Sequence, residues 1–266
     1  MGKVDQRKHE MLKLLQEEEA MDISSVAETF QISLPTARRM CTDLANEGLA
    51  IRTHGGIRKL TFHKEHTNGT EDYYSFDLRQ KEFVEEKSRI AEYASSLVQN
   101  NQIIFIEAGT TILLFSIALA ERIRQKEITD LVIFTNSLIT LNTLSPVHDN
   151  IMMVGGHYRE SRKDFSGYFS EQALKGLRFN SCFVGADAIS LTDGVMAMDI
   201  DTVRFDTEVV SHSEKAYVLA DSKKFNKSSL ISYATGNEIT SIITDDGLPD
   251  AVAEEYKRHN FNILIV

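Results

Sequence analysis

The second half of the chain carries a segment whose residues suit the binding of an anion. Glu107-Ala108-Gly109-Thr110-Thr111 follows the apolar run IIFI and precedes a helical pattern. Glycine lets the backbone approach a ligand closely, while free N–H groups at a helix start, the helix dipole and threonine hydroxyls favour an anion. The segment predicts a phosphate-binding turn, although Gly-Thr-Thr at a helix start is often only a cap.

Polar residues also follow other apolar runs, and they predict a larger site. They are Thr135-Asn136-Ser137, Gly155-Gly156 with Tyr158 and Arg159, Gly185-Ala186-Asp187, and Asp221-Ser222-Lys223-Lys224-Phe225. Several polar strand ends and a lysine pair at one edge of the sheet together predict a pocket for an anionic polar ligand, which no one of these segments would predict alone. The alternative is that they are separate turns and caps. The expected ligand-binding residues are Glu107, Gly109, Thr110, Thr111, Thr135, Asn136, Gly155, Arg159, Asp187 and Lys224.

A second group of residues, near the N-terminus, has the chemistry of DNA recognition. Arginine pairs bidentately with guanine or binds phosphate, and a short helix that exposes Thr and Arg suits the major groove. A following segment, LAIRTHGGIRKL, alternates loosely and turns at Gly55-Gly56, which predicts a β-wing. His54 could equally support that turn or contact phosphate. The expected DNA-binding residues are Ser33, Thr36, Arg38, Arg39, Thr42, Arg52, His54 and Arg58.

Three helices are predicted to position these N-terminal residues. Residues 4–17 form the first helix, with Met11, Leu12 and Leu15 on one face. The second helix is capped by Asp22 or Ser24, and its apolar face holds Ile23, Val26, Ala27 and Phe30. The third helix has Ser33 as its N-cap, Pro35 in its first turn and Gly48 at its end. Two short helices with a tight turn, followed by a wing, predict a winged helix-turn-helix. The alternative is a helical bundle with arginines on its surface.

The C-terminal part alternates apolar runs with helical patterns after a long helix predicted from Leu78 to about Gln99. The apolar runs are Ile103–Ile106, Leu131–Phe134, Ile151–Val154, Ser181–Val184, Ala216–Leu219, Ser241–Ile243 and Asn262–Val266. Such alternation predicts a mostly parallel sheet covered on both faces, whose ligands bind beyond the carboxyl ends of the strands. The expected fold class is therefore α/β.

Composition and length predict two domains joined by a linker. The chain has 266 residues, enough for one small domain and one larger one. We expect a DNA-binding domain at 1–60, a linker at 61–76 and a ligand-sensing domain at 77–266. The linker, TFHKEHTNGTEDYYSF, is polar and without a clean period. His63 and His66 lie in it, and with no cysteine beside them a solvated segment is favoured over a metal site.

The charge of the chain is distributed unevenly. The net charge is −10, but residues 1–60 hold nine basic and nine acidic residues, so the acidic excess lies in the rest of the chain. A local basic face matters more for phosphate binding than the total. No apolar run could span a bilayer, no signal peptide is visible, and Cys41 and Cys182 lie in apolar patterns as expected buried thiols. We expect a cytoplasmic protein with no metal and no cofactor.

The N-terminal motifs resemble those of the DeoR family of bacterial transcriptional regulators. The family pattern of a Ser, Thr-x-Arg-Arg, a Leu, a Gly and Arg-x-His-Gly-Gly stands here as Ser33, Thr36, Arg38, Arg39, Leu44, Gly48, Arg52, His54, Gly55 and Gly56. The chain departs from the family at Met40-Cys41, where Asp-Leu is usual, and at Ala37, where a larger β-branched residue is common.

The resemblance extends through the C-terminal part. The family's Asp-x-Gly-Thr-Thr, Thr-Asn, Gly-Gly, Gly-Ala and Asp-x-Ser-Lys-Phe motifs match the segments that begin at residues 107, 135, 155, 185 and 221. Glu107 replaces the usual Asp, Lys223 replaces a Ser, and Ala188 stands where Gly is often found. Such domains look like the fold of ribose-5-phosphate isomerase, which implies a phosphorylated sugar as effector.

The resemblance implies a repressor of a sugar-metabolism operon whose partners are operator DNA, a phosphorylated sugar and further copies of the chain, as a homodimer or homotetramer. The alternative function is a sugar-phosphate isomerase or deaminase with a DNA-binding appendix, for which Asp187, Glu107 and Lys224 could supply acid/base groups. We expect no catalytic residues, because Ala188-Ile189 stand where such isomerases carry a denser acidic cluster. A third hypothesis is a DNA-binding domain on an oligomerisation module.

Overall fold

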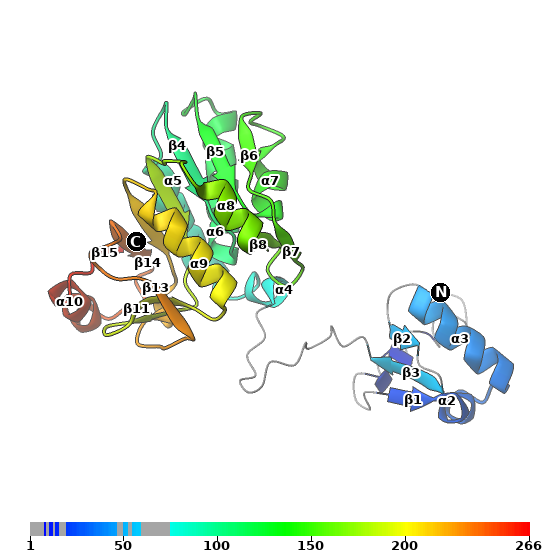
Figure 1. Ribbon diagram of the computed structural model, residues 1–266. Coiled ribbons are helices and arrows are strands. Elements are labelled where there is room, and N and C mark those ends of the chain that lie inside the picture. Colours follow the sequence, from blue (N-terminus) through cyan, green and yellow to red (C-terminus); the bar gives the residue numbers. More distant parts are fainter. Residues whose placement is uncertain are drawn as a thin grey trace. The chain divides into compact units, whose positions relative to one another are not determined.

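The chain folds into two compact units, Met1–Glu71 and Asp72–Val266. The computed structural model describes residues 8, 11, 12, 14, 15, 20–46, 50–52, 55–59 and 75–266, with the backbone alone at residues 46, 51, 58 and 59 (Figure 1). Most of the predicted linker, residues 61–74, lies outside the described residues.

The N-terminal unit combines helices with a small antiparallel sheet. Its elements are β1 (Ala20–Asp22), α2 (Ile23–Thr29), α3 (Leu34–Asn46), β2 (Ala50–Arg52) and β3 (Gly56–Lys59). The strands pair in the order β1-β3-β2, so the segment after α3 forms the predicted wing. The first predicted helix is described only at residues 8, 11, 12, 14 and 15, which are helical.

The helices of this unit are held by a cap and a shared apolar core. Asp22 caps α2, since its side chain accepts a hydrogen bond from the Ser25 N–H at 2.8 Å. Buried apolar side chains from the first predicted helix, from α2 and α3 and from the sheet form one cluster: Met11, Leu15, Met21, Ile23, Val26, Ala37, Met40, Cys41, Leu44, Ala50 and Ile57. The predicted inward positions 37, 41 and 44 are confirmed, and Met40 joins them.

Gly56 sits where the wing crosses the first strand. A Cβ atom there would lie 2.1 Å from the Met21 carbonyl oxygen. Such an approach is possible only for glycine, because any other side chain would push β3 away from β1. The second glycine of the Gly55-Gly56 turn therefore has a packing role in the wing.

The C-terminal unit is built on a seven-stranded sheet in which every neighbouring pair is parallel. The strands are β4 (Ile103–Ile106), β5 (Val132–Thr135), β6 (Ile151–Met153), β9 (Ser181–Val184), β12 (Ala216–Leu219), β14 (Ser241–Thr244) and β15 (Ile263–Ile265). Each of the seven predicted apolar runs forms one of these strands, so the predicted α/β fold is confirmed.

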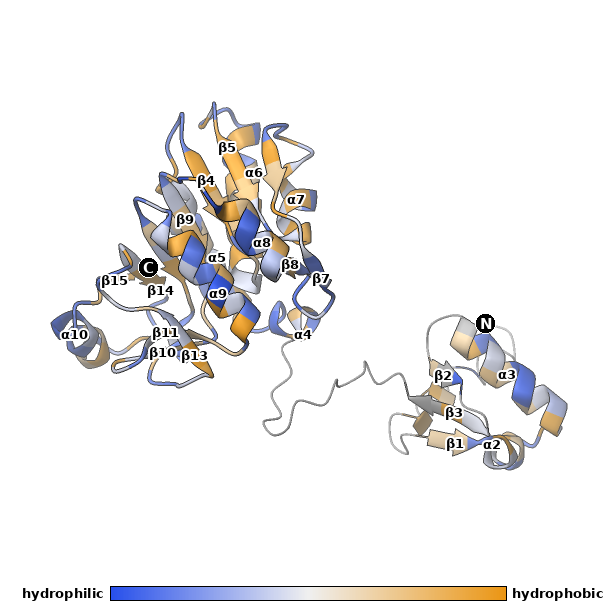
Figure 2. Ribbon diagram, viewed as in Figure 1, coloured by the Kyte–Doolittle hydropathy of each residue, from blue (hydrophilic) through white to orange (hydrophobic). Residues whose placement is uncertain are grey.

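Helices cover both faces of this sheet. They are α5 (Val84–Ser96), α6 (Thr110–Arg124) and α7 (Leu138–Leu144) on one face, and α8 (Tyr168–Leu174), α9 (Ile200–Ser211) and α10 (Asp250–Arg258) on the other. Successive strand residues alternate between the two cores: Ile104 and Ile106 pack with α5 and α6, while Phe105 packs with α9. Figure 2 shows the resulting hydrophobic strands β4 and β5 beneath helices with hydrophilic outer positions.

Smaller elements sit beside the main sheet. β7 (His157–Arg159) and β8 (Asp164–Ser166) form a hairpin, and β10 (Ala188–Ser190), β11 (Gly194–Ala197) and β13 (Ile231–Ala234) form a second, antiparallel sheet. A 3₁₀ turn, η1 (Ser222–Lys224), follows β12. The sequence analysis did not predict the hairpin or the second sheet.

The predicted long helix from Leu78 to Gln99 is wrong. The structure has α4 (Phe76–Arg79) and then α5, separated by a turn at residues 80–83. Phe83 has φ 51° and ψ 44°, a left-handed conformation that a continuous helix cannot contain. The break lets α4 leave the axis of α5 and pack by its buried Phe76, whose N–H donates to the Ser161 carbonyl at 2.9 Å.

Candidate functional site

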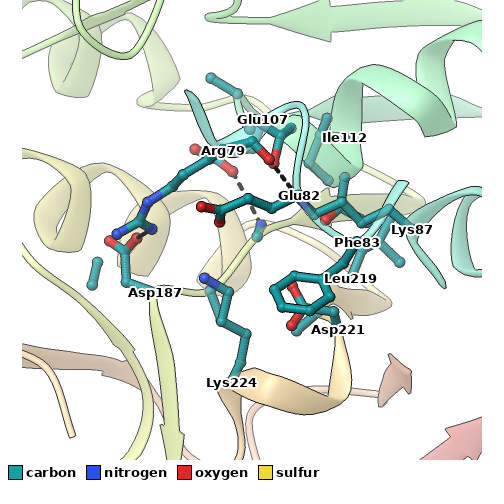
Figure 3. Close-up of a pocket in the computed structure, with 18 of the residues that line it drawn as sticks. Arg79, Glu82, Phe83, Lys87, Glu107, Ile112, Asp187, Leu219, Asp221 and Lys224 are labelled. Carbon is teal, nitrogen blue, oxygen red and sulfur yellow. Dashed lines mark hydrogen bonds and ion pairs between the residues drawn. The ribbon is translucent and has the colours of Figure 1, made fainter. Parts of the chain in front are cut away.

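A pocket of about 360 Å³ opens at the carboxyl ends of β4 and β9 (Figure 3). The strand order is β15-β14-β12-β9-β4-β5-β6, so the chain leaves β4 toward one edge of the sheet and leaves β9 toward the other. Such a reversal opens a crevice between the loops that follow the two strands. Those loops supply Glu107–Ile112 and Gly185–Asp187 to the pocket wall.

The first wall of the pocket is the start of α6. Gly109 is the N-cap of this helix, with φ 151° and ψ 164°, a conformation that L-residues with side chains rarely adopt. Thr110 and Thr111 begin the helix and are buried. Because the first N–H groups of a helix have no intrahelical partner, this end offers donors and a positive dipole to a ligand in the pocket.

Lysine side chains line the same pocket. Lys87 comes from α5, Lys223 and Lys224 from η1, and Lys227 from the loop that follows η1. Burial lowers the pKa of Lys87 and of Lys224, and the nearby Asp221 carboxylate only partly offsets this effect. Positive charges held out of water in one cavity gain from a bound anion, which makes this end of the pocket suited to phosphate.

Asp187 joins three elements around the pocket through ion pairs. Its carboxylate accepts from Arg79 Nη1 of α4 at 2.8 Å and from Arg162 Nη2, after β7, at 3.0 Å. The Met198 N–H donates to it at 3.0 Å. Burial by itself would raise the pKa of Asp187, but Arg162 and Arg79 hold it below its ordinary value. In Figure 3, Arg79 reaches Asp187 while Lys224 extends into the pocket from the other side.

Two buried carboxyl groups, those of Glu107 and Asp206, also line the pocket. Glu107 follows β4 and Asp206 lies in α9, so neither is on an element that supplies a lysine. Glu107 Oε2 accepts a hydrogen bond from the Gly185 N–H at 3.0 Å. Burial raises the pKa of Glu107 to about 8 and raises that of Asp206 well above its ordinary value, with the Glu107 carboxylate adding to the effect on Asp206. In both groups, burial therefore favours the protonated form of the carboxyl group.

The structure brings six of the ten expected ligand-binding residues to the pocket: Glu107, Gly109, Thr110, Thr111, Asp187 and Lys224. The other four, Thr135, Asn136, Gly155 and Arg159, do not line it. Asn136 donates to the Phe165 carbonyl at 3.0 Å, and the Thr135 hydroxyl accepts from the Ser137 N–H at 3.0 Å.

Arg159 and Gly155 also have partners within the fold. Arg159 donates to both carboxylate oxygens of Asp164, at 2.8 and 2.6 Å, and to Asp199 at 2.7 Å. The Gly155 carbonyl accepts from the Ser170 hydroxyl at 2.9 Å. These contacts tie the β7–β8 hairpin to α8 and α9, beside the pocket.

Several pocket residues were missed by the sequence analysis: Arg79, Glu82, Phe83, Lys87, Arg162 and Asp206. Two of them carry a signal that could have found them. Lys87 shares a helical face with the buried residues Ile90 and Ala94, and Asp206 shares one with Val203 and Val210. A charged residue on the apolar face of a helix is rarely buried unless it has a partner or a function.

The second candidate surface is the exposed side of α3. Ser33 caps this helix, since the Thr36 N–H donates to the Ser33 hydroxyl at 3.4 Å, and the two hydroxyls lie 2.8 Å apart. Thr36, Arg38, Arg39 and Thr42 are all exposed, opposite the buried positions 37, 40, 41 and 44. The helix thus presents donors and positive charge to solvent, as the sequence predicts.

The wing residues are described unevenly. Arg52 is half-buried, and its guanidinium donates to the Gly56 carbonyl across the hairpin. Arg58 lies in β3, but its side chain is outside the described residues, as is the whole of His54. Arg52 therefore has a structural contact in the wing, and its expected DNA contact stays a prediction.

Cys41 and Cys182 are free, buried thiols, as predicted. Burial raises the pKa of Cys182 to about 12. Within the described ranges, no group of three or more His, Cys, Asp or Glu could hold a metal ion. The part of the chain that the structure describes contains no helix long and apolar enough to cross a membrane.

Comparison with protein families now assigns both units. Residues 7–61 match the DeoR-like helix-turn-helix domain, and residues 82–246 match the DeoR C-terminal sensor domain. The chain belongs to the DeoR family. The resemblance drawn from its motifs is therefore confirmed, and the protein is a DNA-binding transcriptional regulator and not an enzyme.

Known DeoR-family members are similar to this chain over nearly its full length. The HTH-type transcriptional regulator IolR of Bacillus subtilis is 26% identical over 97% of the chain and 97% of its own length. The lactose phosphotransferase system repressor of Staphylococcus epidermidis is 29% identical over 92% of the chain and 93% of its own length.

Among solved structures, ribose 5-phosphate isomerase A of Methanocaldococcus jannaschii is similar to part of the chain. The match has a TM-score of 0.39 and 20% identity, and it covers 52% of this chain. The matched part spans only 53% of the length of that isomerase.

Proposed function

We propose that this DeoR-family regulator represses an operon for sugar metabolism and that a phosphorylated sugar bound in the pocket relieves the repression. Its relatives support this proposal, since one is named as a repressor of a lactose phosphotransferase system. The family match to a sensor domain supports it as well. Ligand binding would act by favouring one of two states of the regulator, which differ in their affinity for DNA.

The observation that carries the sugar-phosphate proposal is that the buried Lys87 and the half-buried Lys224 lie in one cavity with the start of α6. Lys87 and Lys224 line the same cavity as Gly109, Thr110 and Thr111. Phosphate binds well at a helix N-terminus and forms charge-assisted hydrogen bonds with ammonium groups. In this proposal the phosphate occupies this end, and the sugar extends toward Glu107 and Asp187. Thr135, Asn136, Gly155 and Arg159 then act from behind the pocket wall.

Operator DNA is the second ligand. We infer that α3 enters the major groove, with Ser33, Thr36, Arg38, Arg39 and Thr42 facing the DNA, and that Arg52, His54 and Arg58 contact the backbone from the wing. The exposure of the α3 residues supports this orientation. Symmetric half-sites require an even number of copies, so we propose a homodimer or homotetramer, which works in the cytoplasm where its operator lies.

The test of this function combines ligand binding with DNA binding. Thermal unfolding of the full chain is followed with ribose 5-phosphate, fructose 6-phosphate, glucose 6-phosphate and inorganic phosphate. A sugar phosphate at a hundred times its Kd should add about 2.7 kcal/mol of stability. The same compound should weaken binding to a DNA duplex obtained by in vitro selection at least tenfold, measured by fluorescence anisotropy.

The controls locate the site. Thr110→Val and Lys224→Ala should keep DNA affinity and lose the response to the sugar phosphate. If no sugar phosphate stabilises the protein, or if both variants respond like the wild type, the proposed function or its location is wrong.

A further inference from the structure

The pocket contains two carboxyl groups, on different elements, that the phosphate end does not use. Glu107 follows β4 and is 4% exposed, while Asp206 lies in the middle of α9 and is 2% exposed. Both line the cavity. Two acids buried in a ligand pocket need a reason, because a buried carboxylate without a partner is costly.

Three neighbouring aspartates are paired with arginines. Asp164 pairs with Arg159, and Asp199 pairs with both Arg159 and Arg162. Asp187 pairs with Arg162 and Arg79. These three aspartates and three arginines form a continuous, balanced network along one side of the pocket.

Glu107 and Asp206 are outside this network. Within the described ranges, neither has a lysine, arginine or histidine within ion-pair distance. The one hydrogen bond to Glu107 is the backbone N–H of Gly185, and Asp206 Oδ1 is buried without any partner among the described residues. Hydrogen-bonding capacity is therefore left over at a buried side chain that lines the cavity.

Carboxyl groups in this situation keep a proton. Burial raises the pKa of Glu107 to about 8, with the Asp164 carboxylate adding to the shift and Arg162 and Arg159 opposing it. The pKa of Asp206 moves in the same direction for the same reasons. A protonated carboxyl group both donates and accepts a hydrogen bond, which is the pattern that a sugar hydroxyl also offers.

We propose that Glu107 and Asp206 are specificity-determining residues, which bind hydroxyl groups at the end of the ligand opposite its phosphate and exclude a second anionic group from that end. This inference rests on the proposed function, because it assumes that the phosphate lies near Lys87 and Lys224. The ligand class is then a sugar monophosphate with an uncharged, hydroxyl-bearing far end.

The exclusion follows from the same geometry. A carboxylate or second phosphate at that end would be buried beside two neutral carboxyl groups that, within the described ranges, have no cation within ion-pair distance. Its charge would lose its solvation without gaining a counter-ion, whereas hydroxyls satisfy the open positions without adding charge. Sugar bisphosphates and phosphorylated sugar acids should therefore bind poorly, although they carry the same phosphate.

The experiment uses isothermal titration calorimetry on the full chain at pH 7. The tightest of ribose 5-phosphate, fructose 6-phosphate and glucose 6-phosphate is compared with the acid analogue of the same sugar, ribonate 5-phosphate or gluconate 6-phosphate. We expect the neutral sugar to bind at least tenfold more tightly than its acid. In the double variant Glu107→Leu with Asp206→Leu, which roughly keeps the size and removes the hydrogen-bonding groups, the affinity for the neutral sugar should fall at least tenfold, so its preference over the acid shrinks.

Two further measurements keep the inference falsifiable. Glu121→Leu, the same change at an exposed position of α6, should keep the full preference. Glucosamine 6-phosphate should bind no more than tenfold more tightly than glucose 6-phosphate; a larger gain that the double variant removes would mean that the pair is a counter-ion for an amine, and would overturn the hydroxyl assignment.

The failure of this inference differs from that of the proposed function. If sugar monophosphates bind and the double variant still rejects the acid analogue like the wild type, the acid pair does not determine specificity and the inference is wrong, while the proposed function stands. If no sugar phosphate binds the wild-type chain, the proposed function is wrong and the inference falls with it.

Discussion

Lys87 Nζ lies 2.7 Å from the carbonyl oxygen of Arg79, the last residue of α4. The ammonium group therefore holds the C-terminal end of α4 while it also lines the pocket. Because the carbonyls at a helix end have no intrahelical partner, the Arg79 carbonyl accepts from Lys87 in addition to the Glu82 N–H, at 3.2 Å. An ammonium group has three N–H donors, so Lys87 can keep this bond and still donate to an anion in the pocket.

Replacing Lys87 tests its part in phosphate binding. Lys87→Met keeps the length of the side chain in its buried position but removes the charge. A charge-assisted hydrogen bond contributes about 1.5–3 kcal/mol, so the affinity for the sugar phosphate should fall about 10- to 100-fold in calorimetric titration. Lys81→Met, at an exposed lysine outside the pocket wall, should leave the affinity unchanged. Equal affinities for all three proteins would contradict a phosphate contact by Lys87.

The ion pair between Arg79 and Asp187 should hold α4 against the rest of the unit. Asp187→Asn leaves two partly buried arginines with a weaker acceptor, so we expect a loss of about 1–3 kcal/mol in the free energy of unfolding. Amide hydrogen exchange should become faster in α4 first, because α4 has few other contacts and its Arg79 forms an ion pair with the Asp187 carboxylate. Asp193→Asn, at an acid of the β10–β11 turn, is the control. Unchanged exchange in α4 would show that Phe76 and Lys87 hold this helix in place without the ion pair.

The sheet could be predicted from the sequence because its signal is local. Each central strand is a short apolar run between helical patterns, and strands buried on both faces must be apolar at every position. The polar residues that follow β4 and β9 could be predicted for the same reason, since a strand end is visible as the end of an apolar run. Glu107, Gly109 and Asp187 were found in this way.

The rest of the site depends on contacts between distant segments. The turn before α5 requires a left-handed Phe83, a conformation that no local rule assigns to phenylalanine. Arg159 follows an apolar run and was expected in the pocket, but the β7–β8 hairpin turns it toward Asp164 and Asp199. Neither the hairpin nor the ion-pair network has a sequence pattern strong enough to predict it.

The exposed arginines of α3 lead to a prediction about salt dependence. If Arg38 or Arg39 neutralises a DNA phosphate, its replacement by alanine should weaken binding and reduce the slope of log K against log salt concentration by about 1. Fluorescence anisotropy with selected operator DNA, over a series of salt concentrations, measures both quantities. Arg124→Ala, at an exposed arginine of the C-terminal unit, is the matched control. An unchanged slope together with relaxed base preference would instead place the arginine on a base edge.

The buried Glu107 should make the stability of the C-terminal unit depend on pH. Its pKa is raised from 4.5 to about 8 by burial, so the folded protein binds this proton more tightly than the unfolded chain does. The corresponding stabilisation is complete below pH 4.5 and is lost as the pH rises through about 8, with a slope of at most about 1.4 kcal/mol per pH unit in between. Asp206, whose pKa shifts in the same direction, adds to this loss.

Glu107→Gln should therefore flatten the fall in unfolding free energy between pH 5 and 8, measured by urea denaturation with circular dichroism. The variant has no titrating proton at this position, and only the contribution of Asp206 remains. Glu121→Gln, on the exposed side of α6, should follow the wild-type curve. A Glu107→Gln curve as steep as that of the wild type would mean that Glu107 is ionised in the folded protein, and that a cation or water neutralises it in the pocket.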